Sequence, residues 1–175
     1  IIIAQHEMVA ISAAMGYTQV TGRPQAVVVH VDVGTQNLGA GVHNASRSRV
    51  PVFLIAGLAP VTAHGELPGG KSNAVHYVQD VYDQRGIVRE YVKWEYELRS
   101  GLNTVDAVAR GFQMAATEPA GPVYLTVARE VLEELTNLPQ HLPSVVLPEP
   151  TLPDPASVDW LVEKLRRSER PLLIT

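Results

Sequence analysis

Short apolar runs alternate with segments of helical periodicity along most of the chain. Four runs have the length and composition of strands, and they lie at Ile1–Ala4, Ala26–Val31, Pro51–Ala56 and Pro122–Val127. The second and third runs are almost continuously apolar, which predicts strands that are buried on both faces. We expect these strand side chains to be buried: Val27, Val29, Val52, Leu54, Val123 and Leu125.

Helical spacing of apolar residues occupies the intervals between these runs. Three predicted helices cover about His6–Val20, Gly34–Arg47 and Asn73–Tyr82. A fourth begins at a cap provided by Asn103 or Thr104. Its apolar stripe consists of Val105, Val108, Ala109, Phe112 and Ala116. Strands that alternate with helices predict an α/β fold with a mainly parallel sheet and helices on both faces.

The composition changes near residue 138. Six of the 13 prolines lie between Pro139 and Pro155, which predicts an extended linker. After it, Asp154 and Pro155 form a helix start signal, and Leu172–Thr175 has the pattern of a strand. We interpret residues 1–137 as one domain truncated at its N-terminus, 138–153 as a proline-rich linker and 154–175 as the start of a second α/β domain. Because the chain opens inside an apolar run, we expect it to be part of a longer protein.

The composition argues against several classes of protein to which the chain could belong. The 175 residues are 46% hydrophobic with a net charge of −4, which argues against global disorder and against nucleic-acid binding. The chain has no cysteine, so disulfides, thiolate zinc sites and cysteine catalysis are excluded. No apolar run reaches the roughly 18 residues of a membrane span. We expect a soluble cytoplasmic protein without membrane contact.

Two motif candidates fail on spacing. His6-Glu7 begins like a zinc-protease helix, but Ala10 stands where the second histidine ligand is required. The stretch from Gly39 to Asn44 resembles a dinucleotide fingerprint, yet Asn44 replaces the third glycine. We therefore expect no metal ligands and no Rossmann site in this chain.

Glu7 lies at the predicted junction between a strand and a helix. In a parallel sheet this junction is at the carboxyl edge, where ligands bind. An acidic residue in the first helical turn also interacts favourably with the helix dipole. Taken alone, Glu7 is therefore either a functional carboxyl or a helix-terminus acid.

The residues around Glu7 extend this pattern. Residues 5–24 read Gln-His-Glu-Met-Val-Ala-Ile-Ser-Ala-Ala-Met-Gly-Tyr-Thr-Gln-Val-Thr-Gly-Arg-Pro. This stretch resembles the His-Glu-x-x-Ala-x-x-Ala-Ala-x-Gly-Tyr-x-x-x-Thr-Gly segment of thiamine-diphosphate-dependent enzymes of the acetolactate synthase group. Further similar elements are His30–Asn37 to Thr-x-Gly-Pro-Gly-x-x-Asn, Val78–Asp80 to Phe-Gln-Glu, and Gly121–Leu125 to the Gly-Pro-Val strand. The chain departs from the family pattern at His30, Asp32, Val33 and Val78.

The resemblance implies a pyrimidine-binding domain. Its glutamate, here Glu7, hydrogen-bonds N1′ of the aminopyrimidine ring and thereby promotes loss of the thiazolium C2 proton. Such a carboxyl is expected in a mostly dry pocket, where burial raises its pKa. By the same resemblance, Gln79 is a catalytic residue on the substrate side. The residues implied to bind the cofactor are Glu7, His30, Val33, Gly34 and Asn37.

The resemblance also implies partners. The diphosphate and Mg²⁺ are held by a Gly-Asp-Gly … Asn motif of a separate domain, and this chain has no Gly-Asp-Gly. A homo-oligomer, dimer or tetramer, is therefore expected, with half of the cofactor site supplied by a partner subunit. A bound FAD is compatible with the group. We expect the chain alone to be inactive.

The implied reaction is decarboxylation of a 2-oxo acid followed by carboligation, as in acetolactate synthase. One alternative keeps the family and is a 2-oxo-acid decarboxylase or an aldehyde lyase. A second alternative is a non-catalytic relative that keeps the fold for dimerisation. Because such a relative is expected to lose the acid at position 7, the retained Glu7 favours an enzyme.

Overall fold

A four-stranded sheet forms the centre of the computed structural model, which describes residues 1–137, 144–149 and 151–174. The strands are β1 (Gln25–Val29), β2 (Val52–Leu58), β3 (Trp94–Leu98) and β4 (Val123–Ala128). They lie in the order β1-β2-β4-β3, and all three pairings are parallel. The predicted α/β fold with a parallel sheet is therefore confirmed.

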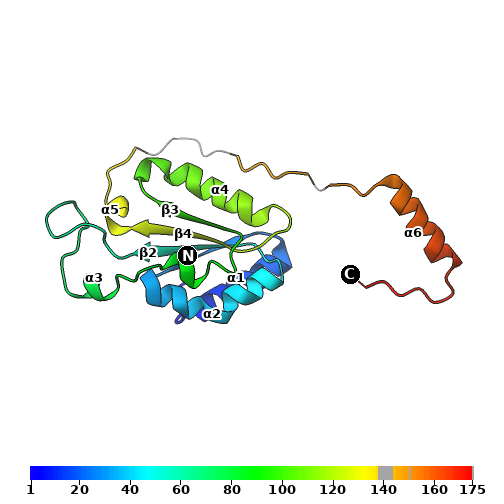
Figure 1. Ribbon diagram of the computed structural model, residues 1–175, viewed down its shortest axis with the longest axis horizontal. Coiled ribbons are helices and arrows are strands. Elements are labelled where there is room, and N and C mark those ends of the chain that lie inside the picture. Colours follow the sequence, from blue (N-terminus) through cyan, green and yellow to red (C-terminus); the bar gives the residue numbers. More distant parts are fainter. Residues whose placement is uncertain (138–143, 150, 175) are drawn as a thin grey trace.

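Helices cover both faces of this sheet (Figure 1). One face packs against α1 (Glu7–Thr21) and α2 (Val31–Arg47), and the other packs against α4 (Thr104–Ala116). The shorter elements are α3 (Val75–Val78), α5 (Arg129–Leu132) and the 3₁₀ turns η1 (Arg85–Ile87) and η2 (Gly101–Asn103). The order of layers is thus helices, sheet, helix.

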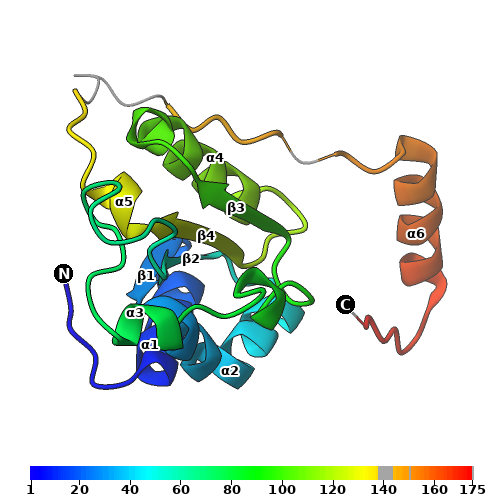
Figure 2. The same ribbon diagram turned by 60° about the vertical axis from the view of Figure 1, so that its left-hand side comes forward.

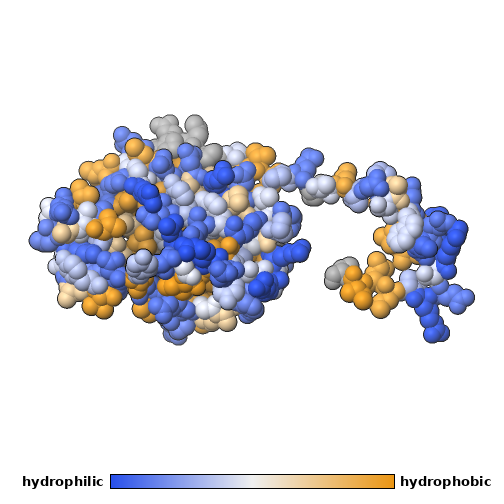
Figure 3. Space-filling model, viewed as in Figure 1, coloured by the Kyte–Doolittle hydropathy of each residue, from blue (hydrophilic) through white to orange (hydrophobic). Residues whose placement is uncertain are grey.

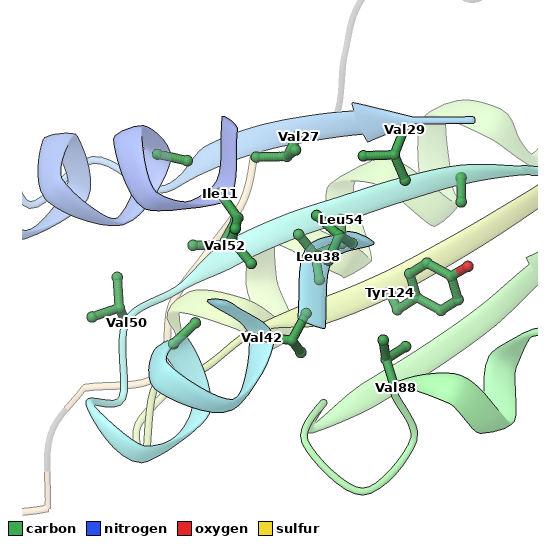
Figure 4. Close-up of a cluster of buried hydrophobic side chains, with 13 residues drawn as sticks. Ile11, Val27, Val29, Leu38, Val42, Val50, Val52, Leu54, Val88 and Tyr124 are labelled. Atoms are coloured by element: carbon green, nitrogen blue, oxygen red, sulfur yellow. The ribbon is translucent and has the colours of Figure 1, made fainter. Parts of the chain in front are cut away.

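The core has two clusters, one on each side of the sheet. Figure 4 shows the first, in which Val27, Val29, Val52 and Leu54 meet Ile11 and Leu38 from α1 and α2. The second lies under α4, and its buried members are Phe53, Leu98, Ala107, Ala115, Val123, Leu125 and Val127. The six strand side chains predicted to be buried are all at most 8% exposed.

The face that α4 turns to the sheet differs from the predicted stripe. Its buried residues are Ala107, Gly111 and Ala115, whereas the predicted stripe residues are half-buried. At Gly111, an added Cβ would lie 2.6 Å from Phe53 Cζ. The smallest residues therefore let α4 approach the sheet closely, and its larger side chains pack along the sides of the contact.

Two predictions about strands at the N-terminal side were wrong. Residues Ile1–Ala4 form no strand, and the three isoleucine side chains are exposed because no strand of the sheet pairs with them. β1 is buried on one face only, since Val28 is 74% exposed. The reason is position: β1 is an edge strand, and α4 packs on β2, β3 and β4 rather than on β1.

Other element predictions were only partly correct. The predicted helix over Asn73–Tyr82 shortens to α3, and β3 was not predicted. The side chains of the two predicted caps, Asn103 and Thr104, do not accept from the first amides of α4. Asn103 makes no side-chain cap, and Thr104 Oγ1 instead donates to the preceding Gly101 carbonyl at 2.8 Å.

The C-terminal part of the chain contains α6 (Pro155–Arg167). Asp154 caps it by accepting from the Ser157 amide at 3.0 Å, and Pro155 occupies its first turn, as predicted. Figures 1 and 2 show α6 away from the sheet, and none of its residues is buried. Leu172–Ile174 forms no strand, because no neighbouring strand pairs with it, and this exposed apolar end is orange in Figure 3.

The segment predicted as a linker is described only in part. Residues 144–149 and 151–154 contain neither helix nor strand, and their side chains are exposed. Residues 138–143 and 150, and Thr175 of the predicted terminal strand, lie outside the described residues. Over the described ranges, no helix is long and apolar enough to cross a bilayer.

Candidate functional site

The N-termini of α1 and α2 meet beside the carboxyl end of β1. One residue, His30, separates the last residue of β1 from α2, so the first turn of α2 lies at the carboxyl edge of the sheet. Glu7 begins α1, and His6 caps that helix by accepting from the Met8 amide through Nδ1 at 3.1 Å. The packing of α1 on α2, rather than a preceding strand, therefore places Glu7.

Glu7, Gly34 and Asn37 form one cluster. The Asn37 side-chain amide donates to Glu7 Oε2 at 3.1 Å. A Cβ added at Gly34 would lie 3.2 Å from Val29 Cβ and 3.5 Å from Glu7 Oε1. The structure thus brings together three of the residues singled out from the sequence, at the end of β1. Asn37 acts from the second turn of α2 rather than from its start.

The carboxyl of Glu7 is held in its ionised form. Its pKa is lowered, first by its own backbone amide and further by the Asn37 hydrogen bond and the charges of His6 and His30, against an opposing effect of desolvation. The side chain is 27% exposed, so the dry pocket expected from the sequence is not formed by this chain. The expected rise in pKa is therefore reversed here.

His30 and Val33 flank this cluster on the solvent side. His30 occupies the N-cap position of α2, is exposed, and makes no side-chain cap. Val33 is 55% exposed, whereas its neighbour Gly34 is buried. An apolar side chain and an ionisable ring are thus available to a ligand that lies over Gly34.

Gln79 lies elsewhere. It follows α3 and lines an open hollow beyond the carboxyl end of β2. The other residues of this hollow are Leu58, Ala59, Val61, Asp80, Val81, Tyr82, Asp83, Gln84, Arg85 and Glu97. None of Glu7, Gly34 and Asn37 lines this hollow. Gln79 and the Glu7–Gly34–Asn37 cluster therefore occupy separate places along the carboxyl edge of the sheet.

Two polar residues near these places were not singled out as candidates. Asp32 in the first turn of α2 is 6% exposed, and its Oδ1 has no hydrogen-bond partner among the described residues. Gln84 is buried and bonded to α2, β2 and β4. Sequence gave no signal for Gln84, because it lies in a segment without periodicity. Over the described residues, no three His, Asp or Glu side chains gather as metal ligands would.

Comparison with known proteins identifies proteins that are similar to this chain in sequence. Residues 1–87 match the family profile described as thiamine pyrophosphate enzyme, N-terminal TPP binding domain. The chain is 27% identical to benzoylformate decarboxylase of Pseudomonas aeruginosa, with 99% of this chain and 31% of that protein covered. It is also 27% identical to the acetolactate synthase large subunit of Parasynechococcus marenigrum, with 98% of this chain and 27% of that protein covered. The chain thus spans less than a third of the length of these curated relatives.

A solved structure shares the fold. It is an X-ray structure of a protein described as a thiamin diphosphate-dependent enzyme, isolated from Mycobacterium smegmatis. The TM-score is 0.76 at 24% identity, and the match covers 96% of this chain and 30% of the other.

Proposed function

We propose that this chain, which belongs to the thiamine-pyrophosphate-dependent enzymes of the acetolactate synthase group, holds the aminopyrimidine side of that cofactor at Glu7, Gly34 and Asn37. The cluster around Gly34 is the observation that carries the proposal. A side chain at position 34 would occupy the space beside Glu7 Oε1 and the end of β1, and glycine leaves that space to a flat ring.

The polar groups also suit this ring. An aminopyrimidine offers a ring nitrogen that hydrogen-bonds a carboxyl group, and Glu7 supplies a partly exposed carboxyl at this position. Asn37 fixes one oxygen of that carboxyl at 3.1 Å, which limits its rotation. His30 and Val33 complete the open side of the cluster as contacts for the ring.

Thiamine pyrophosphate, when bound, supplies a thiazolium carbon that becomes nucleophilic toward carbonyl groups after losing its proton. The part of this chain in that step is proton handling. Glu7 holds or releases a proton at the ring nitrogen, and Asn37 keeps the carboxyl oriented. Covering of Glu7 by a partner subunit would reduce its hydration and raise its pKa from the lowered value of the single chain.

We further propose that the natural protein cleaves the carboxyl group from a 2-oxo acid and then joins the remaining fragment to a second carbonyl compound. Relatives named acetolactate synthase favour this carboligation. A second candidate ends the reaction by protonation, which releases an aldehyde. His30 favours the second candidate, because its exposed imidazole at the N-cap of α2 lies beside the cluster and is a side chain of the type that serves as a general acid. Gln79 belongs to the substrate side in both cases.

We assign the diphosphate and Mg²⁺ to a part of the natural protein outside this chain, and we propose a dimer or tetramer in which another subunit completes the site. We also propose the division into a cofactor domain over 1–137, a linker over 138–153 and a second domain from 154 onward.

Calorimetric titration of the natural protein with thiamine pyrophosphate and Mg²⁺ tests the cofactor proposal. Saturable binding that weakens in Gly34→Ala is expected, and absence of binding contradicts the proposal. Product analysis by NMR after incubation with a panel of 2-oxo acids then separates aldehyde release from carboligation. His30→Ala is expected to lower aldehyde release if protonation ends the reaction.

A further inference from the structure

Three buried side chains form a hydrogen-bonded cluster between α2, β4 and the segment before η1. The Tyr124 hydroxyl lies 2.7 Å from Thr35 Oγ1, and Gln84 Nε2 donates to the Tyr124 hydroxyl at 3.0 Å. Thr35 and Tyr124 are completely buried, and Gln84 is 5% exposed. Figure 4 shows the Tyr124 ring inside the apolar cluster, with its hydroxyl directed toward the carboxyl end of the sheet.

The hydrogen bonds of this cluster have one consistent direction. Thr35 Oγ1 donates to the Val31 carbonyl at 2.8 Å, so its lone pair accepts from the Tyr124 hydroxyl. Gln84 Nε2 directs one hydrogen to the Gly57 carbonyl at 2.8 Å and the other to the Tyr124 hydroxyl, and the second hydrogen is shared with Thr35 Oγ1 at the longer distance of 3.4 Å. Burial raises the pKa of the Tyr124 phenol, which keeps this proton in place. Because each donor has a partner, the cluster is rigid and costly to break.

The cluster joins the two separate groups of candidate residues. Thr35 directly follows Gly34, and it lies two residues before Asn37 in α2. Gln84 lines the hollow together with Gln79, and it ties the far end of segment 79–84 to β2 and β4. The near end of that segment is held by the ion pair of Asp80 with Lys71.

We infer that Thr35, Tyr124 and Gln84 are positioning residues that fix the Gln79 hollow relative to the Glu7–Gly34–Asn37 cluster. The inference rests on the proposed function, in which the Gln79 hollow receives the substrate and the Glu7–Gly34–Asn37 cluster receives the cofactor ring. The three side chains are buried and act on the hollow through Gln84 and segment 79–84, whereas Gly34 and Asn37 are held in place by helix α2 itself. Loosening the cluster is therefore expected to weaken substrate binding while leaving proton handling at Glu7 intact.

Two substitutions remove a hydroxyl with little change in volume. Tyr124→Phe removes the hydroxyl that joins Gln84 to Thr35 and leaves these two side chains only their longer, 3.4 Å contact, and Thr35→Val removes the acceptor of Tyr124. In the natural protein with thiamine pyrophosphate and Mg²⁺, we expect KM for the 2-oxo acid to rise about tenfold in either variant. Cofactor affinity and hydrogen–deuterium exchange at thiamine C2 are expected to stay within about twofold of wild type. Thr35→Ser keeps the hydroxyl, and its KM is expected to equal that of wild type.

A destabilised core elsewhere serves as the matched control. Phe112→Leu loosens the packing of α4 against Phe53 on the opposite face of the sheet. Peptide-resolved amide hydrogen exchange is expected to increase over residues 79–84 in Tyr124→Phe, and not in Phe112→Leu. An unchanged KM in Tyr124→Phe, or the same KM change in Phe112→Leu, overturns the inference. A wild-type protein that fails to bind thiamine pyrophosphate overturns the proposed function as well, and titration of the wild type reveals this outcome before any variant is compared.

Discussion

The side-chain amide of Asn37 donates to Glu7 Oε2 across 3.1 Å and joins two residues that lie 30 positions apart. This bond links the first turn of α1 to the second turn of α2. Gly34 lies one turn before Asn37, and its missing side chain opens the space beside the same carboxyl. An oriented carboxyl next to an open backbone is what the proposed cofactor contact requires.

Removing the Asn37 amide is expected to raise the pKa of Glu7. That pKa is lowered first by the backbone amide of Glu7, and Asn37 adds to this effect, so Asn37→Ala shifts it back toward the ordinary value. A lowered folded-state pKa stabilises the fold above the unfolded-state pKa of about 4.3, and the gain is lost as pH falls through the folded-state value. NMR titration of the Glu7 carboxyl carbon measures the midpoint. An unchanged midpoint contradicts the role of Asn37, and Asn44→Ala on the same helix is the control.

A methyl group at position 34 is expected to weaken cofactor binding without unfolding the domain. In Gly34→Ala the new Cβ meets Val29 Cβ at 3.2 Å and Glu7 Oε1 at 3.5 Å. The crowding offsets the gain of about 1 kcal/mol in helix propensity, so the free energy of unfolding changes by less than about 1 kcal/mol. The dissociation constant of thiamine pyrophosphate is expected to rise about tenfold. Gln36→Ala, on the exposed side of α2, serves as control, and equal affinities in both variants would refute the contact.

The periodicity of the sequence predicted the helices of the sheet's two faces and three of its four strands. β3 was missed because Trp94–Leu98 lacks the continuous apolar run of the other strands. Its alternation of apolar residues with Glu95 and Glu97 is typical of a half-buried strand and suits the edge of the sheet. The exposure of Val28 could not be predicted either. The exposure of Val28 depends on which strands α4 covers, and the local sequence of β1 does not determine this.

The residues of the candidate site were also predicted only in part. Glu7, Gly34 and Asn37 were predicted to share a site because the sequence around them resembles the motifs of a known family, and the structure brings them together at the ends of α1 and β1. Gln84 lies in a segment without periodicity, and its partners Thr35 and Tyr124 are 49 and 40 residues away. Contacts over such distances arise from the tertiary structure, so the buried cluster was not predicted.

Close packing of α4 is expected to make Gly111 sensitive to substitution. In Gly111→Ala the added Cβ lies 2.6 Å from Phe53 Cζ. The Phe53 ring is fully buried, so it cannot move away without disturbing its neighbours. The free energy of unfolding is expected to fall by about 1–3 kcal/mol, despite the better helix propensity of alanine. Gly16→Ala in α1 meets no atom within 4 Å and is expected to stabilise the chain slightly. Urea unfolding of both variants is the measurement, and equal stability would contradict this packing.

A buried carboxylate fixes the loop that follows β2. Glu130 Oε1 accepts from the Thr62 amide at 2.8 Å and from Thr62 Oγ1 at 2.7 Å. Burial acts to raise the pKa of Glu130, but the hydrogen bonds from Thr62 and from the backbone amides of Glu130 and Val61 together outweigh it, and the pKa is lowered. Loss of the hydroxyl in Thr62→Val is expected to cost about 1.5–3 kcal/mol near pH 7.

The same loss has a predicted pH dependence. Because the folded-state pKa of Glu130 is lowered, its contribution is present above the unfolded-state value and disappears as pH falls through the folded-state value. The stability difference between Thr62→Val and wild type should therefore shrink in acid. Thr62→Ser retains the donor and should behave like wild type, and a difference that is constant from neutral to acid pH would contradict the assignment.

The exchange rate of the thiamine C2 proton tests most directly whether Glu7 is the proton-handling carboxyl. Glu7→Gln keeps the size of the side chain and a partner for Asn37, but it removes the group that holds and releases the proton. In the natural protein saturated with thiamine pyrophosphate and Mg²⁺, hydrogen–deuterium exchange at C2 is expected to slow by about 10²–10⁴-fold. Equal exchange rates in wild type and Glu7→Gln would mean that Glu7 only stabilises the start of α1, and the proposed site would be contradicted.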